Sequence, residues 1–189
     1  MPDLRVITVG GGQFFKGSEN TVEELTDILL AGEKYLRRLT EAGTAAEIVA
    51  KAMAFELHIG ISYFVEIAKL RALRLLWANV LEAYDVVDNQ CFIHTKIDND
   101  TQVADIHTNK IRATTQAMSA VIGGADRLTV SPSSDDALGR RMARNVQHLL
   151  QLESYLDRVA DPAAGSFYIE KLTDSLCEAV WEKFQAAFS

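Results

Sequence analysis

Cysteine, proline and long apolar runs are scarce in this chain of 189 residues. Its two cysteines, Cys91 and Cys177, are far apart and have no CxxC companion, which favours reduced side chains in a cytoplasmic protein over a structural disulfide. No apolar run reaches the roughly 18 residues of a membrane span, and the first residues lack the basic and apolar regions of a signal peptide. We therefore expect a protein with no membrane contact.

An excess of positive charge is missing as well. The 19 Lys and Arg residues are scattered and are outnumbered by 26 Asp and Glu residues, which gives a formal net charge of −7. Nucleic-acid phosphates are bound by clustered cations, so we expect no nucleic-acid partner. The four histidines, His58, His94, His107 and His148, do not have metal-ligand spacing, so no metal site is predicted and structural roles are expected for them.

What the chain does contain is an alternation of strand-like and helix-like patterns. Apolar runs predict strands over residues 4–9, 55–61, 90–94 and 127–130. Apolar residues at three- and four-residue spacing predict helices over about residues 21–43, 63–84, 109–122, 134–159 and 170–187. The capping-box patterns that start at Thr21 and Thr44 predict two helix starts, the second opening a further short helix.

Four strand-helix units predict parallel strands joined by right-handed crossovers. A closed eight-unit barrel takes about 250 residues, so the predicted class is α/β, with an open sheet or about half of a TIM-type (β/α)8 barrel. One or both edge strands are then exposed to a partner. Ligand-binding residues are expected where the strands end, near residues 10–13, 60–63, 94–96 and 130–133.

The stretch VGGGQFFKG, residues 9–17, lies between a predicted strand and a predicted helix, where a phosphate loop would lie. A dinucleotide loop needs a third glycine where Phe15 stands, and a Walker-type loop needs Lys and then Ser or Thr where Ser18 and Glu19 stand. We therefore expect a turn that needs small residues, not a nucleotide site.

Two helix faces carry charge. Glu23, Glu24 and Glu33 are expected on an exposed face of the first helix. Lys69 and Arg71 flank an apolar stripe in the helix over residues 63–84, and core packing explains that stripe without a cofactor.

Five long segments occur in the order and at about the separations found in one known family. They are ENTVEELTDILLAGEKYLRRLTEAG (19–43), IAKLRALRLLW (67–77), IRATTQAMSAVIGGAD (111–126), RRMARNVQHLLQLES (140–154) and DPAAGSFYIEKLTD (161–174). Together they resemble the substrate-binding barrel of the methylmalonyl-CoA mutase family. Members of this family are isomerases that depend on adenosylcobalamin and rearrange the carbon skeleton of acyl-CoA substrates.

The resemblance implies that residues 1–189 are a single partial domain, the second half of that barrel. The first half and the cobalamin domain, with its Asp-x-His-x-x-Gly motif, have no counterpart here. We therefore expect a segment of a longer polypeptide that does not truly begin at Met1, with no cofactor of its own and with adenosylcobalamin bound by a partner chain.

The resemblance also bears on the glycine-rich stretch. In catalytic chains of the family, a Tyr-His pair follows the corresponding strand, and the His donates a hydrogen bond to the substrate thioester carbonyl. This pair falls on Gly12 and Gln13. The resemblance thus implies the small, non-catalytic subunit, which forms a heterodimer with a large catalytic chain in the interconversion of methylmalonyl-CoA and succinyl-CoA during propionate metabolism.

Three further residues are candidates for substrate binding by resemblance. Arg71 matches an arginine that helps to hold CoA, although a solvated or salt-bridged arginine is the alternative. Asp126 stands where catalytic chains carry a glutamine that faces the acyl-CoA, and a carboxylate would be a poor neighbour for the anionic substrate. His94, at the predicted carboxyl end of a strand, lies near a His-x-Gln substrate segment.

Two alternative functions remain open. The chain could belong to an active mutase for a different acyl group, in which Gln13 replaces the His as hydrogen-bond donor. It could also be a self-standing module that binds acyl-CoA on an open sheet.

Overall fold

Four parallel strands form one sheet in the order β1-β2-β3-β4 in the computed structural model, which describes residues 4–87 and 91–188. The strands are β1 (Ile7–Gly10), β2 (Met53–Ile59), β3 (Ile93–Ile97) and β4 (Arg127–Thr129). The helices are α1 (Thr21–Glu41), α2 (Ala46–Ala52), α3 (Tyr63–Glu82), α4 (Ile106–Ile122), α5 (Ala137–His148) and α6 (Phe167–Ala186). This alternation of parallel strands and helices confirms the predicted α/β class and corresponds to about half of a (β/α)8 barrel.

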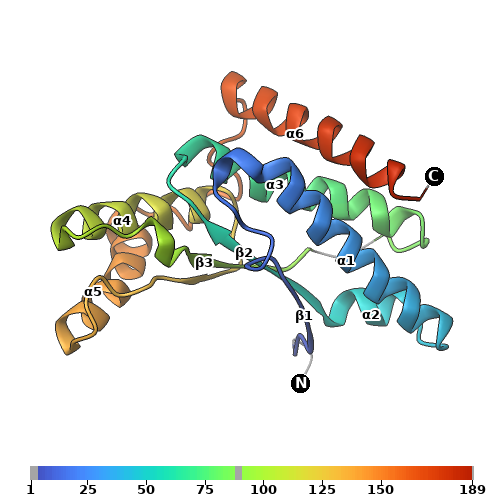
Figure 1. Cartoon of the computed structure of the whole chain (residues 1–189), viewed down its shortest axis with the longest axis horizontal. Helices are drawn as coiled ribbons and strands as arrows, with labels where there is room; N and C mark the ends of the chain where they lie inside the picture. Colours follow the sequence, from blue (N-terminus) through green and yellow to red (C-terminus); the bar gives the residue numbers. More distant parts are fainter. Residues whose placement is uncertain (1–3, 88–90, 189) are drawn as a thin grey trace.

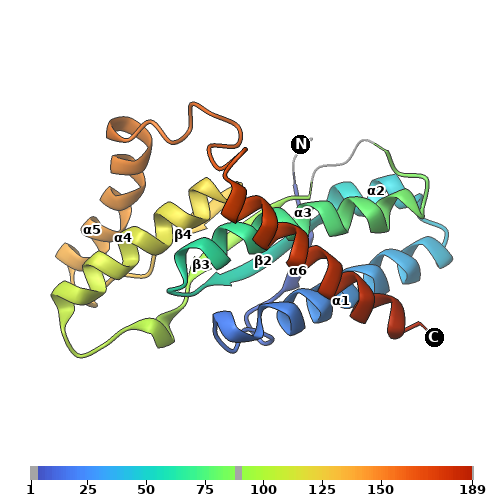
Figure 2. The same cartoon turned by 90° about the horizontal axis from the view of Figure 1, so that it is seen from above.

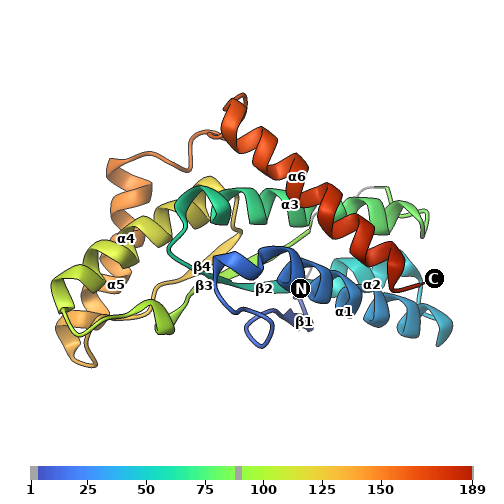
Figure 3. The same ribbon diagram turned by 45° about the horizontal axis from the view of Figure 1, so that its top comes forward.

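The helices cover one face of the sheet. Figure 1 shows α1, α3, α4 and α6 on the same side, and α6 lies across α3 and α1 (Figures 2 and 3). Strand residues that point to these helices are buried, among them Phe55, whose ring packs against Trp77 with 4.8 Å between the ring centroids. The apolar core therefore lies between the sheet and its helices.

The other face of the sheet carries polar side chains. Successive residues of a strand point to opposite faces, and the register of β2, β3 and β4 places Glu56 beside His94 and His58 beside Lys96. We call the side formed by Glu56, His58, His94, Lys96 and Thr129 the open face. It would line the interior if a further set of strands closed the barrel.

Several element boundaries differ from the prediction. β1 begins at Ile7 and not at residue 4, and β2 occupies Met53–Ile59, two residues earlier than expected. β3 occupies Ile93–Ile97, three residues later than the predicted strand over residues 90–94. Gln90, where the predicted strand begins, lies outside the described residues. α6 begins at Phe167 instead of residue 170.

The two predicted capping boxes are wrong. α1 begins at Thr21 itself, whose hydroxyl donates to the Ser18 carbonyl, and no side chain caps α2. The caps with side-chain hydrogen bonds are Asp105, which accepts from two N–H groups at the start of α4, and Asp136 before α5. A carboxylate suits these positions because it accepts from the unpaired N–H groups of the first turn.

The helix predicted over residues 134–159 is shorter than expected. α5 ends at His148, and a π-helical turn over Leu149–Glu153 follows it. Within the described residues, no helix is both long and apolar enough to cross a membrane.

Candidate functional site

The open face is tied together by a network of side chains that crosses three strands. Lys96 Nζ lies 2.7 Å from the Glu56 carboxylate, and His94 Nδ1 lies 3.5 Å from it. On its other side, His94 Nε2 is 2.9 Å from the Thr129 hydroxyl. Burial lowers the pKa of His94, so the neutral imidazole is favoured, although Glu56 acts in the opposite direction. The network joins β2 to β4 through side chains as well as through the backbone.

His94 does not lie at the carboxyl end of its strand. β3 continues for three residues beyond it to Ile97, so the predicted position is wrong, and the strand ends near Lys96 and Asp98 instead. Its role in ligand binding stays a prediction.

The glycine-rich stretch forms a tight turn that follows β1 and begins beside the middle of β2. The Gly11 N–H donates to the Glu56 carbonyl at 2.7 Å, and the N–H groups of Phe14 and Phe15 donate to the Gly11 carbonyl at 2.9 and 3.1 Å. A Cβ at Gly11 would lie 2.6 Å from the Glu56 oxygen and 2.7 Å from Ile28 Cδ1. A side chain is excluded there, which agrees with the prediction that the turn needs small residues.

Gly12 makes room for an imidazole from the neighbouring strand. A Cβ at this position would lie 2.7 Å from His58 Nε2, so the His58 ring takes up the space of a side chain at position 12. Gln13, next in the turn, is exposed. The contact of His58 with Gly12 was not predicted from the sequence, although the alternation of Glu56 and His58 with apolar residues indicated that both point to one face.

Substituting Gly12 with alanine is expected to displace the His58 ring. The contact is with the end of a flexible side chain, so the ring can turn away, and we expect a loss of less than about 1 kcal/mol in the free energy of unfolding. The ring resonances of His58 in an NMR spectrum should shift clearly. Gly10→Ala is the control, because a Cβ at Gly10 has no atom of the described residues within 4 Å, and it should leave these resonances in place.

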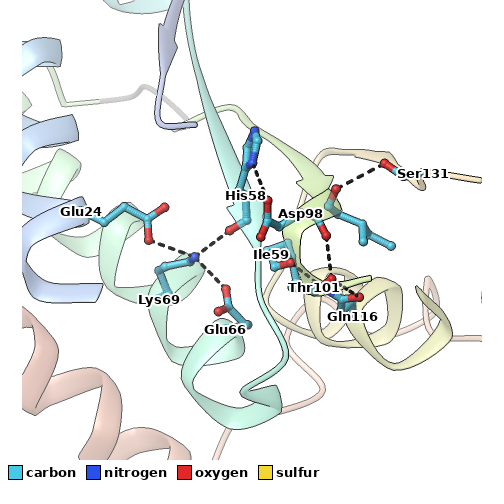
Figure 4. Close-up of polar contacts among 10 residues, drawn as sticks. Glu24, His58, Ile59, Glu66, Lys69, Asp98, Thr101, Gln116 and Ser131 are labelled. Atoms are coloured by element: carbon cyan, nitrogen blue, oxygen red, sulfur yellow. Dashed lines mark hydrogen bonds and ion pairs between the residues drawn. The ribbon is translucent and has the colours of Figure 1, made fainter. Parts of the chain in front are cut away.

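Three charged side chains are buried beneath the turn (Figure 4). Lys69 Nζ lies 3.1 Å from a Glu24 oxygen and 2.7 Å from a Glu66 oxygen, and all three side chains are 0% exposed. The ammonium also donates to the His58 carbonyl at 2.7 Å and lies 4.8 Å from the centre of the Phe15 ring. The expectation that Glu24 is exposed is therefore wrong, as it is for Glu33, and Lys69 belongs to the core.

A second chain of polar contacts holds the carboxyl ends of β2 and β3 (Figure 4). His58 Nδ1 lies 3.5 Å from Asp98 Oδ1, and the Thr101 hydroxyl donates to the Asp98 carbonyl at 2.6 Å. The Gln116 amide of α4 donates to the Ile59 carbonyl at 2.7 Å. The Ile59 carbonyl also accepts from the Asp98 N–H at 3.2 Å, so side-chain and backbone contacts together hold the ends of β2 and β3 in place.

A cavity of about 560 Å³, lined by both polar and apolar residues, lies beyond these strand ends. The walls come from residues 15–19, 60–62, 98 and 100–103 together with Arg112. Parallel sheets bind ligands at this end. Of the strand ends where ligand-binding residues were expected, the cavity is lined by residues 60–62, whereas residues 10–13, 94–96 and 130–133 are not among its lining residues. No group of three or more His, Cys, Asp or Glu side chains in the described part of the chain is arranged to hold a metal ion.

The structure places Arg71 and Asp126 away from the open face. Arg71 lies on α3, pairs with Asp161 and lies 2.8 Å from Glu170, so it joins α3 to α6. Asp126 precedes β4, where it lies 2.8 Å from Arg74 and accepts from the Ile93 N–H at 2.8 Å. Neither residue therefore lies with His94, and their contribution to CoA binding stays a prediction.

Comparisons with known proteins agree on one family. The family model described as Methylmalonyl-CoA mutase matches residues 1–187. The methylmalonyl-CoA mutase small subunit of Porphyromonas gingivalis is 40% identical over 97% of this chain and 31% of its own length. That of Streptomyces virginiae is 36% identical over 97% of this chain and 31% of its own. The methylmalonyl-CoA mutase of Rhizobium meliloti is 34% identical over 96% of this chain and 27% of its own length. The chain spans less than a third of the length of these relatives.

Proposed function

The chain belongs to the methylmalonyl-CoA mutase family, and from that premise we propose that it is a segment of a small, non-catalytic subunit of such an enzyme. In this proposal it supplies half of a barrel, pairs with a large chain that binds adenosylcobalamin, and supports the interconversion of methylmalonyl-CoA and succinyl-CoA. The relatives named small subunit at 36 and 40% identity favour this assignment.

The observation that carries the proposal is the state of the glycine-rich turn. The resemblance places the Tyr-His pair of catalytic chains at Gly12 and Gln13. The His58 ring takes up the space that a tyrosine at position 12 would need, so the residues around the turn are adapted to its absence. A neutral amide at position 13 stabilises developing charge on a carbonyl less well than an imidazole does.

Co-purification is the direct test. The full-length protein that contains this chain would be expressed with a cobalamin-binding mutase chain of the same organism and measured by light scattering. We expect a one-to-one complex and mutase turnover only when the large chain is present. Turnover by the purified small chain with adenosylcobalamin alone would refute the proposal.

An active mutase with a different acyl substrate is the second candidate, and the exposure of Gln13 favours it. The described residues give its side chain no hydrogen-bond partner, so its amide is free to donate to a ligand. This candidate expects Gln13→Ala to reduce the rate of the full-length protein with at least one acyl-CoA. An unchanged rate with every acyl-CoA would count against it.

A further inference from the structure

The buried cluster beneath the glycine-rich turn contains more acids than bases. Glu24 and Glu66 provide two carboxyl groups and Lys69 provides one ammonium, all with 0% of the side chain exposed. If both carboxyl groups were ionised, the cluster would have a net charge of −1 without contact with water. Such a charge is strongly unfavourable in the protein interior, and a bound proton removes it.

Glu24 is the group that would take this proton. Its Oε1 is buried, and the described residues offer it no hydrogen-bond donor. Both oxygens of Glu66 have a partner, because Oε1 accepts from the Ser18 hydroxyl at 2.8 Å and Oε2 lies 2.7 Å from Lys69 Nζ. Burial raises the pKa of Glu24 to about 7, opposed by Lys69 and reinforced by Glu66 and Asp98. The charged and titratable groups that face the cluster are Lys69 and Glu66 on α3, His58 on β2, and Asp98 after β3.

The cover over this cluster is the glycine-rich segment, residues 11–18. Phe15 lies against the Lys69 ammonium, and Ser18 donates to Glu66, so the middle and the last residue of the cover contact the cluster directly. Close packing at Gly60 leaves no spare room, because a Cβ there would lie 2.8 Å from Ser18 Oγ and 2.9 Å from Glu66 Oε1. Residues 15–18 of the cover also form part of the wall of the 560 Å³ cavity.

We propose that a proton bound by Glu24, within the cluster that it forms with Glu66 and Lys69, holds residues 11–18 against the end of β2, and that loss of this proton loosens the segment and the cavity wall that it forms. The inference does not depend on the proposed function. When the proton leaves, the cluster gains a negative charge, and displacement of the cover, which contacts the cluster through Phe15 and Ser18, lets water reach it.

The direction of the pH dependence follows from proton binding. The carboxyl of Glu24 has its ordinary pKa of 4.5 when exposed and about 7 when covered, so the closed state binds more protons between these values. The stability of the closed state, in which residues 11–18 cover the cluster, therefore falls as the pH rises from 4.5 to about 7 and levels off above that.

Hydrogen exchange read by mass spectrometry tests the proposal. In the full-length protein, the protection of amides in residues 11–18, corrected for the intrinsic effect of pH, should fall by up to about tenfold between roughly pH 6 and pH 8. Glu24→Gln, which keeps the shape of the protonated group, should abolish this fall. Glu23→Gln is the matched control, because Glu23 is exposed on the same helix, and it should keep the fall.

Two results would overturn the proposal. One is a wild-type segment whose protection does not change with pH, and the other is the same pH dependence in Glu24→Gln. If Glu24→Gln does not fold, the carboxyl carbon resonances of the wild-type glutamates give the answer. A glutamate resonance that titrates near neutral pH, with the resonances of Phe15 changing over the same pH range, supports the proposal. The absence of such a glutamate overturns it.

Discussion

Replacement of Lys69 by methionine is expected to lower the free energy of unfolding by about 3–5 kcal/mol, because it leaves two buried carboxyl groups without their cation. Methionine has nearly the length of the lysine stem, so the packing loss is small and the effect is electrostatic. The loss should be larger at pH 8 than at pH 5, since protonation at low pH removes part of the uncompensated charge. Urea denaturation at the two pH values measures both effects.

Lys183→Met is the matched control for this prediction. Lys183 pairs with Glu23 at the surface, where the side chains are 49% and 55% exposed. Water and salt screen such a pair, so its removal should change stability much less. Equal losses in the free energy of unfolding for the two lysine variants would show that burial of the cluster does not increase the effect of removing its cation.

Gly11→Ala is expected to have the second largest effect, a loss of about 1–3 kcal/mol, because the new methyl group would overlap both the Glu56 carbonyl and Ile28. The carbonyl belongs to the central part of the sheet and cannot move freely, so the turn itself must shift. Urea denaturation of the variant and the wild type measures this loss in the free energy of unfolding.

The neighbouring Gly10→Ala provides the comparison for Gly11. The two glycines are adjacent, but in the part of the chain that the structure describes no atom lies within 4 Å of a Cβ at Gly10. We expect little change in stability for Gly10→Ala, since the substitution removes chain freedom mainly from the unfolded state. If both variants lose the same free energy of unfolding, the close contacts at Gly11 are not the reason why the turn needs glycine there.

The order of strands and helices could be predicted because it depends on local patterns. Apolar residues recur at helical spacing in α1 and α3 and alternate with polar residues in β2, and each pattern fits one type of element. Boundaries were less predictable, since they depend on which groups satisfy the terminal N–H and carbonyl groups. Thr21 illustrates this, because its hydroxyl bonds to Ser18 instead of capping α1.

The candidate site was only partly predictable. Gly12 and Gln13 could be identified by resemblance, but nothing near them in the sequence indicates that His58 fills the neighbouring space, 46 residues further along the chain. Glu24 was expected on an exposed face with Glu23, because its burial depends on how α1 packs against α3. His94 was placed at the wrong end of β3 for the same reason: the strand's extent depends on its partners.

The sequence by itself determined the α/β class, the parallel half-barrel and the family, because periodicity and long ordered segments are properties of the chain alone. Only the tertiary structure decided that Glu24, Glu66 and Lys69 share one buried site, that His58 replaces a side chain at Gly12, and that Arg71 and Asp126 make structural ion pairs. These facts depend on contacts between residues far apart in the chain, and burial, which sets the energy of a charge, exists only once the elements are packed.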